Sequence, residues 1–313
     1  MIRFYQNRKK YFLISATFFV IAIVFAFING VKLDIQFKGG AILSYAYNGA
    51  EVNTADVSRV VSETLGNTAL PDIQLTENIA TDSADRYKIV INLAGDNGLS
   101  AQEQDSLEAA LRETFPTLDI RTSETRVVQP FIGARFITNC LIAIALGFLM
   151  IILYVWYAFR KIGGLSAGVM AIVALIHDVA VVLSIFIIFN IPIDESFVIA
   201  ALTIIGFSVN DTIVVYDRIR ENTAMYGTKL PIDELVNKSV NQSLTRSINT
   251  SAAVFVSVLV IYVFTELYGI NSMRSFTLPM LFGTVSGCYS TICICGPLWV
   301  SWKKRGEKKA LAK

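Results

Sequence analysis

The chain has 313 residues, of which 54% are hydrophobic and only 17% are charged, and its mean hydropathy is +0.54. An ordinary soluble domain carries roughly 25% charged residues, so this composition argues against a water-soluble protein and predicts a polytopic helical membrane protein. The formal net charge of +2 carries little information by itself, and no nucleic-acid partner is expected.

Six apolar segments have about the length of 20 residues that is needed to cross roughly 30 Å of hydrocarbon. They cover residues 11–29, 137–158, 165–189, 196–216, 247–264 and 276–302. The first follows Arg8, Lys9 and Lys10, as a signal peptide would, but no small-x-small cleavage motif follows it. We therefore interpret residues 1–29 as a short amino-terminal stretch and a retained helix.

The basic residues predict the orientation of these segments, because lysine and arginine in short loops remain in the cytoplasm. Basic residues precede the first segment, join the second to the third and the fourth to the fifth, and form a tail at 303–313. The loop at 190–195 has only Asp194 and Glu195 as charged residues. Both termini are therefore predicted to be cytoplasmic, and residues 30–136 to be extracytoplasmic. The expected location is the cytoplasmic (inner) membrane, which the chain would cross several times.

Residues 30–136 are long and polar enough for a separate small domain. Strands are predicted at 41–47, 72–78, 87–93 and 119–128, and helices at 54–65 and 100–115. Ser100 and Glu103 have the spacing of a capping box, and the strand with Ile89 and Ile91 alternates in polarity. This β-α-β-β-α-β order is typical of a ferredoxin-like α+β domain. We find no nucleotide motif or catalytic nucleophile in it, so no enzyme activity is expected.

The second to sixth segments, with their loops, make up residues 137–302. Between the fourth and fifth segments, residues 231–245 carry apolar side chains at helical spacing on a polar body. We interpret them as an amphipathic helix that lies at the cytoplasmic interface and leads into the fifth segment.

Small residues in the apolar segments are interpreted as packing residues. Cys293 and Cys295 lack the two-residue gap of a zinc or redox pair, and all four cysteines fall within predicted helices. We therefore expect no metal and no cofactor. Gly283 and Gly287 have the spacing of a close helix contact.

The fourth segment contains an acid, Asp211, in an otherwise apolar run. An ionised carboxylate at membrane depth is costly, so such a residue usually faces the bundle interior, where it is paired or titrates. Ser208 and Arg218 share its helix face, and Asn210 and Thr212 flank it. The functional interpretation competes with a structural one, in which a helix-end hydrogen bond or Arg218 holds the carboxylate in place.

A polar stripe opens the fifth segment, at the membrane face toward which Asp211 is displaced. Its members recur at the spacing of one helix face and are Arg246, Asn249, Thr250, Ala253 and Ser257. We expect Arg246 to pair with Asp211, in contact or through water, which would make both charges tolerable. The alternative is an arginine that extends to the membrane surface.

His177 and Asp178 lie at the centre of the third segment. Histidine changes charge near physiological pH, and Asp178 could tune it. Because adjacent residues on a helix point about 100° apart, they need not bond each other, and Asp178 can reach a neighbouring helix instead. A direct role in proton transfer and a role in helix packing and hydration both remain open.

Four stretches resemble elements of the SecD/SecF family of the bacterial Sec export machinery, in the resistance-nodulation-division (RND) superfamily. Residues 206–221 are similar to the family's run G-Y-S-x-N-D-T-x-V-x-x-D-R-x-R-E, with Phe207 in place of the common Tyr. Residues 244–251 resemble its L-x-R-S-x-x-T-S element, 174–178 its A-L-x-H-D and 37–40 its FxGG. The first run is long and mixed enough to be highly specific, whereas FxGG alone is a weak signal.

The resemblance implies an RND-type half bundle of six transmembrane helices, in a SecDF complex that uses the proton or sodium motive force to promote protein translocation. It implies SecD as the partner, working beside SecYEG and SecA, with a YidC-type insertase, exported unfolded polypeptide and membrane lipid as further contacts. Asp211 and Arg246 would belong to the ion-coupling site. The residues that would surround them are Ser208, Asn210, Thr212, Asn249 and Thr250. The residues that would form the loop anchoring the outer domain are Phe37, Gly39 and Gly40.

Two other functions remain as alternatives. An RND-type transporter of lipids or drugs is one, although six helices and one outer domain make only half of the usual duplicated unit. A passive scaffold subunit of the translocon, whose polar residues only pack, is the other. The sequence contains no ATP site, so an ion gradient or a partner must supply the energy.

Overall fold

The computed structural model describes residues 2–34, 40–48, 52–66, 71–77, 87–94, 99–128, 130–268 and 271–311. Phe37 and Gly39 of the predicted anchoring loop lie outside these residues, and Gly40 opens a strand. The chain divides into two units. The helical unit comprises Met1–Lys32, Ile142–Tyr262 and Ser275–Lys313, and the other unit comprises Leu33–Leu141 and Val263–Arg274.

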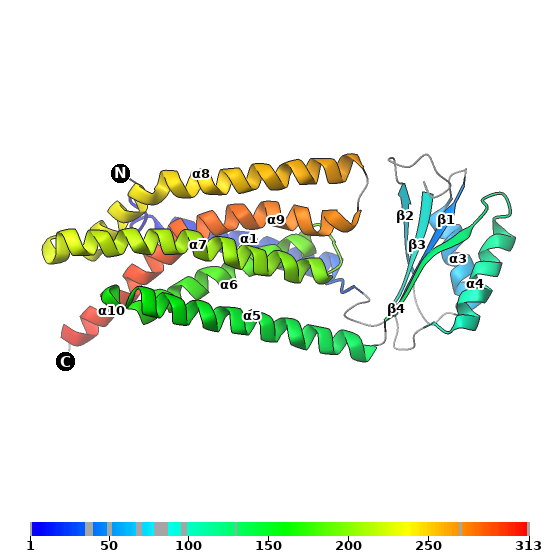
Figure 1. Cartoon of the computed structure of the whole chain (residues 1–313), viewed down its shortest axis with the longest axis horizontal. Helices are drawn as coiled ribbons and strands as arrows, with labels where there is room; N and C mark the ends of the chain where they lie inside the picture. Colours follow the sequence, from blue (N-terminus) through cyan, green and yellow to red (C-terminus); the bar gives the residue numbers. More distant parts are fainter. Residues whose placement is uncertain are drawn as a thin grey trace. The chain divides into compact units, whose positions relative to one another are not determined.

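The six predicted transmembrane segments are confirmed as helices long and apolar enough to cross a membrane, so the chain is a polytopic helical membrane protein. The helices are α1 (Arg8–Asn29), α5 (Pro130–Ala158), α6 (Gly164–Ile188), α7 (Glu195–Tyr226), α8 (Ile232–Leu267), α9 (Asn271–Tyr289) and α10 (Gly296–Leu311) (Figure 1). A π-helical turn, Ser290–Cys295, joins α9 to α10, and the three together form the sixth span.

The last span, α6 and α7 form the interior of the helical unit. Within their most apolar stretches, 72%, 50% and 44% of the residues are buried, against 6% in α1 and in α5 and 11% in α8. The three outer helices therefore offer apolar surface to lipid or to another protein.

Two glycines allow α9 to approach its neighbours closely. A Cβ on Gly283 would lie 2.6 Å from Ile204 Cγ1 of α7 and 3.2 Å from Val182 Cγ2 of α6. A Cβ on Gly287 would lie 3.2 Å from Ser208 Cβ. The close contact predicted from the spacing of these glycines is confirmed.

Replacing Gly283 with Ala is expected to destabilise the helical unit, because the added methyl overlaps a buried isoleucine. Overpacking of this kind costs about 1–3 kcal/mol. Gly147→Ala is the matched control, since nothing lies within 4 Å of a Cβ at that position. Thermal unfolding of the full chain in lipid nanodiscs measures both, and equal melting temperatures for the two variants would contradict the close contact.

The helix predicted over 231–245 is present and leads directly into the fifth span, because it forms the first part of α8, which begins at Ile232. No glycine or proline interrupts the chain from Ile232 to Leu267, so the backbone can continue as one helix of 36 residues. The apolar stripe of this part is buried by protein: Leu235, Val236 and Val240 belong to the same core as Tyr216 and Trp299.

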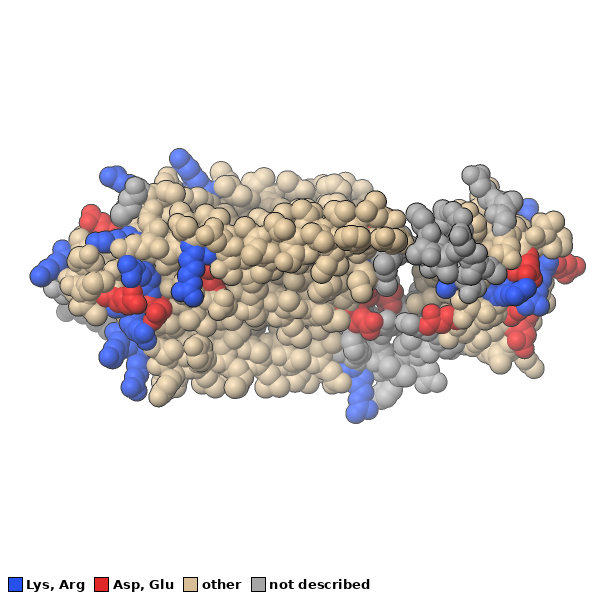
Figure 2. Space-filling model, turned by 45° about the horizontal axis from the view of Figure 1, so that its top comes forward, with Lys and Arg blue, Asp and Glu red and all other residues tan. Residues whose placement is uncertain are grey.

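The start of α8, the amino terminus and the end of α10 lie together at one end of the helical unit. The Tyr5 amide donates to Asn237 Oδ1 (3.0 Å), and Lys304 Nζ lies 2.7 Å from Asp233 Oδ1. In the face shown in Figure 2, charged side chains of this unit gather at that end and leave a long uncharged stretch beside it. Both ends of the chain and its basic α7–α8 connection are therefore on one side of the bundle.

The other unit contains a four-stranded antiparallel sheet with the order β2-β3-β1-β4 (Figure 1). Its strands are β1 (Gly40–Tyr47), β2 (Asp72–Glu77), β3 (Tyr87–Ala94) and β4 (Arg121–Val128), and its helices are α3 (Thr54–Leu65) and α4 (Ala101–Thr114). The strand predicted from residue 119 begins two residues later, because Asp119 has a φ of 43° and turns the chain.

The two helices cover one face of this sheet. Ile89 and Ile91 of β3 are fully buried, which confirms the predicted alternation, and they share a core with Val57 of α3 and Leu107 of α4. The predicted capping box of α4 is also confirmed. The Ser100 hydroxyl, and then its amide, hydrogen-bond the Glu103 carboxylate and hold the pKa of Glu103 below its usual range.

Candidate functional site

Asp211 lies on α7 and is 5% exposed. Its Oδ1 accepts a hydrogen bond from Ser247 Oγ of α8, at 2.6 Å. Its Oδ2 is buried and has no hydrogen-bond partner in the described part of the chain. A buried oxygen without a donor is costly for a carboxylate, so this oxygen is a position where a proton or another cation would be stabilising.

Asp211 and Arg246 are not in direct contact in the described structure, and a pair bridged by water, the other form of the prediction, stays a prediction. Among the described residues, no ion pair or hydrogen bond joins the two side chains, and the carboxylate binds Ser247, the residue next to Arg246, instead. Arg246 is exposed, as are Asn249 and Thr250 of the stripe that was expected to face inward.

The face of α8 that does point inward carries serines. Ser243, Ser247 and Ser251 are buried and recur every four residues. These serines were not predicted as part of a site, and their four-residue spacing in the sequence is the signal that could have identified this face. Successive helical residues point about 100° apart, so placing Ser247 against Asp211 turns Arg246 away.

The residues near Asp211 on α7 also divide between the two faces. Thr212 is buried and lies 3.0 Å from Thr291, hydroxyl to hydroxyl, whereas Asn210 is exposed. Arg218 donates to Gln242 (2.8 Å) and Glu221 (2.6 Å). The alternative in which Arg218 holds the Asp211 carboxylate is therefore wrong.

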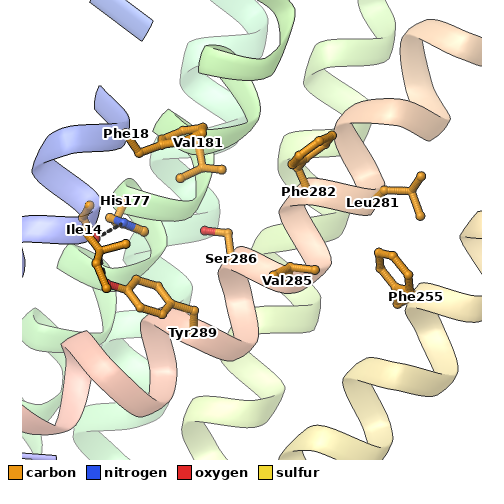
Figure 3. Close-up of a pocket in the computed structure, with 11 residues that line it drawn as sticks. Ile14, Phe18, His177, Val181, Phe255, Leu281, Phe282, Val285, Ser286 and Tyr289 are labelled. Carbon is orange, nitrogen blue, oxygen red and sulfur yellow. Dashed lines mark hydrogen bonds between the residues drawn. The ribbon is translucent and has the colours of Figure 1, made fainter. Parts of the chain in front are cut away.

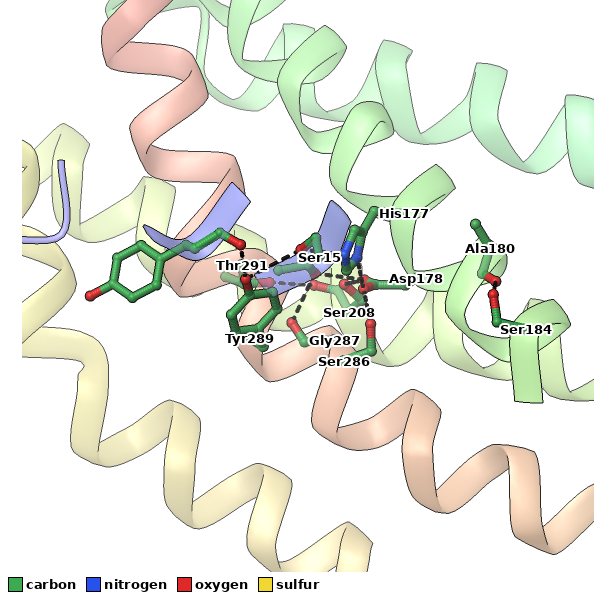
Figure 4. A network of polar contacts seen from close by, with 12 residues as sticks. Ser15, His177, Asp178, Ala180, Ser184, Ser208, Ser286, Gly287, Tyr289 and Thr291 are labelled. Carbon is green, nitrogen blue, oxygen red and sulfur yellow. Dashed lines mark hydrogen bonds and ion pairs between the residues drawn. The ribbon is translucent and has the colours of Figure 1, made fainter. Parts of the chain in front are cut away.

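Asp178 of α6 is fully buried and lies at the centre of a second polar cluster (Figure 4). Its Oδ2 accepts from Ser208 of α7 and Ser290 of the π-helical turn, both at 2.7 Å, and its Oδ1 accepts from Ser286 of α9 at 2.6 Å. Asp178 therefore reaches neighbouring helices, as one of the two interpretations allowed. Ser208, predicted to accompany Asp211, binds Asp178 instead.

His177 contacts its neighbour as well as α1. Its Nδ1 lies 3.2 Å from Asp178 Oδ1, and its Nε2 lies 3.0 Å from Ser15 Oγ. Ser15 and the π-helical turn were not predicted as part of a site. The turn brings Ser290 to Asp178 and Thr291 to Thr212, the residue after Asp211. π-Helical turns are rare overall, and those that occur are often found at functional sites.

Metal binding receives no support from the part of the chain that the structure describes, where no three His, Cys, Asp or Glu side chains are grouped to hold an ion. The four cysteines are free, and Cys293 and Cys295 are buried in the π-helical turn. The chemistry available at both clusters is therefore that of carboxylates, hydroxyls and one imidazole.

Comparison with known proteins places this arrangement in a family. The family described as protein export membrane protein SecD/SecF, C-terminal, matches residues 106–305. Protein translocase subunit SecF of Thermobaculum terrenum is 34% identical over 97% of this chain and 95% of its own length. That of Anaerolinea thermophila is 32% identical over the whole of both chains.

Two solved structures are similar as well. The crystal structure of SecDF from Thermus thermophilus, a translocon-associated membrane protein, superposes with a TM-score of 0.78 at 28% identity, over 97% of this chain. SecDF in a super-membrane-facing form gives a TM-score of 0.67 at 27% identity, over 99% of this chain. This chain spans 39% and 40% of the length of those two SecDF chains. The resemblance inferred from the sequence motifs is thereby confirmed, and the chain belongs to the SecD/SecF family of protein export membrane proteins, among relatives that are SecF subunits.

Proposed function

We propose that this chain is the SecF-type subunit of a SecDF complex, in which the proton motive force promotes protein translocation and Asp211 is the ion-coupling carboxylate. The buried Asp211 carboxylate carries the proposal: Ser247 satisfies one oxygen and the other has no partner among the described side chains. Such a group can take up and release a proton without breaking its hydrogen bond to α8. Sodium is the alternative coupling ion, because carboxylate and hydroxyl oxygens also suit a hard cation.

An exposed polar surface next to this site supports a partner within the membrane. Asn210 of α7 and Arg246, Asn249 and Thr250 of α8 are all exposed in otherwise apolar spans. Polar side chains in spans of this kind almost always face protein or water rather than lipid. A second six-helix protein would cover them, and SecD is the partner we propose, because the similar solved structures are of SecDF.

The same proposal predicts which end of the helical unit faces the cytoplasm and where residues 30–136 lie. The shared end of the helical unit, with both termini and the basic α7–α8 connection, would face the cytoplasm. Residues 30–136 would then be extracytoplasmic. Their antiparallel order β2-β3-β1-β4, with two helices on one face, supports a ferredoxin-like domain. In this arrangement the domain would act on exported polypeptide beside SecYEG, SecA and a YidC-type insertase.

The free energy that the membrane potential supplies is large enough to shift an equilibrium between two arrangements of α7 and α8. A charge that crosses the membrane supplies about 2.3 kcal/mol per 100 mV. Protonation of Asp211 would remove its negative charge from the α7–α8 contact, and the two helices could then adopt a second packing. The movement would pass along the chain to the outer domain.

Export by reconstituted vesicles tests this function. Vesicles that contain SecYEG, SecA and SecD, with or without this chain, receive a preprotein, ATP and an imposed proton gradient. We expect the chain to increase export, and a protonophore to remove the increase. An unchanged increase after the proton gradient collapses would contradict proton coupling, and its loss on removal of sodium alone would identify sodium as the ion. No increase at all would favour the scaffold or half-transporter alternative.

A further inference from the structure

A chain of hydrogen bonds joins α1 to α6 and α9, and its direction is set at one end. The Tyr289 hydroxyl donates to the backbone carbonyl of Tyr11 (2.6 Å), and a carbonyl can only accept. Ser15 Oγ lies 3.2 Å from the Tyr289 hydroxyl and 3.0 Å from His177 Nε2. His177 Nδ1 then lies 3.2 Å from Asp178 Oδ1. These contacts are drawn in Figure 4.

Each hydroxyl has a single hydrogen, and this determines the order of donors. Because Tyr289 gives its hydrogen to Tyr11, Ser15 must donate to Tyr289. Ser15 then accepts from His177, so His177 Nε2 carries a hydrogen. The contact between Nδ1 and Asp178 needs a hydrogen as well, on either the imidazole or the carboxyl. The pair therefore holds one proton more than a neutral histidine beside an ionised aspartate.

The surroundings of the pair supply no other positive charge to Asp178. His177 is the only basic side chain in contact with it among the residues that the structure describes. Two titratable side chains of neighbouring elements contact this network in the described structure: Tyr289 of α9, which contacts Ser15, and Cys295 of the π-helical turn, which lies near Asp178. The basic residues of α1 and α7 form no ion pair with Asp178 among the described residues. With His177 as its only cationic partner among the described residues, Asp178 and His177 are neutral overall when they share one proton in this apolar bundle.

We propose that His177 and Asp178 form a proton-binding site, distinct from Asp211, whose proton sets the direction of this hydrogen-bond chain. When the proton leaves, Nδ1–H donates to the Asp178 carboxylate and Nε2 becomes an acceptor. Ser15 must then turn its hydrogen to His177 and lose its bond to Tyr289. Proton release therefore removes one hydrogen bond between α1 and α9.

A cavity lies next to the imidazole. The cavity has a volume of about 550 Å³, and its lining is apolar except for Ser15, His177, Ser286 and Tyr289 (Figure 3). The His177 side chain is 11% exposed, whereas that of Asp178 is not exposed at all. The imidazole is therefore the member of the pair that borders the cavity, and the carboxylate is reached only through it.

The chain contains a single histidine, so a ¹⁵N-histidine label reports on this site alone. The full chain, purified with a tag that contains no histidine, is placed in lipid nanodiscs and followed by ¹⁵N NMR across about pH 5 to pH 9. We expect Nε2 to carry a hydrogen at the acidic end and to lose it at the alkaline end, while Nδ1 keeps one. Nε2 in the same state throughout this range would overturn the proposal.

Tyr289→Phe tests the direction of the chain. Without the Tyr289 hydroxyl, proton release no longer costs the Ser15 bond, so the proton should be bound roughly three- to tenfold more weakly. The midpoint of the Nε2 change then moves to lower pH. Ser184→Ala is the control, because the Ser184 hydroxyl lies on the same helix and donates only to the Ala180 carbonyl (2.7 Å). Equal midpoints for Tyr289→Phe and the wild type would overturn the assigned direction.

Asp178→Asn tests the other partner. An amide provides no countercharge, so the imidazolium should be lost and Nε2 should change only at a much lower pH, or not at all in this range. A wild-type midpoint in a folded Asp178→Asn chain would overturn the shared proton. Because these measurements read the imidazole itself, their outcome is independent of whether Asp211 drives export.

Discussion

Vesicles containing the Asp211→Asn variant are expected to lose the part of export that depends on the proton motive force. Asparagine has nearly the same shape and its carbonyl oxygen can accept from Ser247, but it cannot bind and release a proton. A charge crossing 100 mV supplies about 2.3 kcal/mol, which biases a two-state equilibrium roughly 50-fold. Loss of the titrating group should remove this bias, and preprotein protected inside vesicles, with and without protonophore, measures it.

Assembly provides the necessary second measurement for this variant. Asp211→Asn should purify with its six-helix partner as the wild type does, because the contact with α8 persists. Asp217→Asn makes the same change on the same helix, where the carboxylate is paired with Arg220 at the surface, and it should retain the response to the gradient. Normal gradient-dependent export by Asp211→Asn would eliminate Asp211 as the coupling group.

The Arg246→Met variant is expected to lose gradient-driven export as well, although Arg246 forms no closed ion pair with Asp211. Arg246 adjoins Ser247, whose hydroxyl donates to the buried carboxylate, so we expect its positive charge to favour the ionised form of Asp211. Without this charge Asp211 would hold its proton more tightly and release it poorly. Export assays in the presence and absence of the gradient give the measurement.

Three further variants distinguish the effect of the Arg246 charge on Asp211 from the effect of the hydrogen bond between Ser247 and Asp211. Ser247→Ala removes the bond of 2.6 Å but leaves the arginine. Arg218→Met removes a neighbouring arginine that binds Gln242 and Glu221, so it should have a milder effect. The double variant Asp211→Asn with Arg246→Met should assemble better than Arg246→Met, because neither charge is left unbalanced. Gradient-driven export at the wild-type level in Arg246→Met would remove Arg246 from the coupling site.

Hydropathy and periodicity predicted much of the fold. The six spans and the alternation in β3 each depend on a run of residues near in sequence, because a helix needs only its own hydrogen bonds and a strand exposes alternate side chains to one face. The capping box at Ser100 is equally local. The helix over 231–245 was likewise predicted from local spacing, but its amphipathic pattern is the same whether lipid headgroups or protein side chains cover it, and only the structure shows that it packs in one core with Tyr216 and Trp299.

The candidate site was predicted in composition but not in pairing. An acid within an apolar span identified Asp211 and Asp178 without a structure. Which donors they meet depends on how each helix is rotated about its axis, and a rotation of one residue, about 100°, exchanges Arg246 for Ser247. Ser15 and Tyr289 are 274 residues apart, and no local pattern relates them.

The sequence by itself determined that the chain spans a membrane six times, that two acids and one histidine lie within the spans, and which family it resembles. These properties follow from the cost of polar groups in hydrocarbon and from contiguous motifs. Tertiary structure alone decided that one oxygen of Asp211 has no partner among the described residues, that three serines surround Asp178, and that Ser15 links His177 to Tyr289. Hydrogen bonds act over about 3 Å, so only the packed positions of the helices could select these partners.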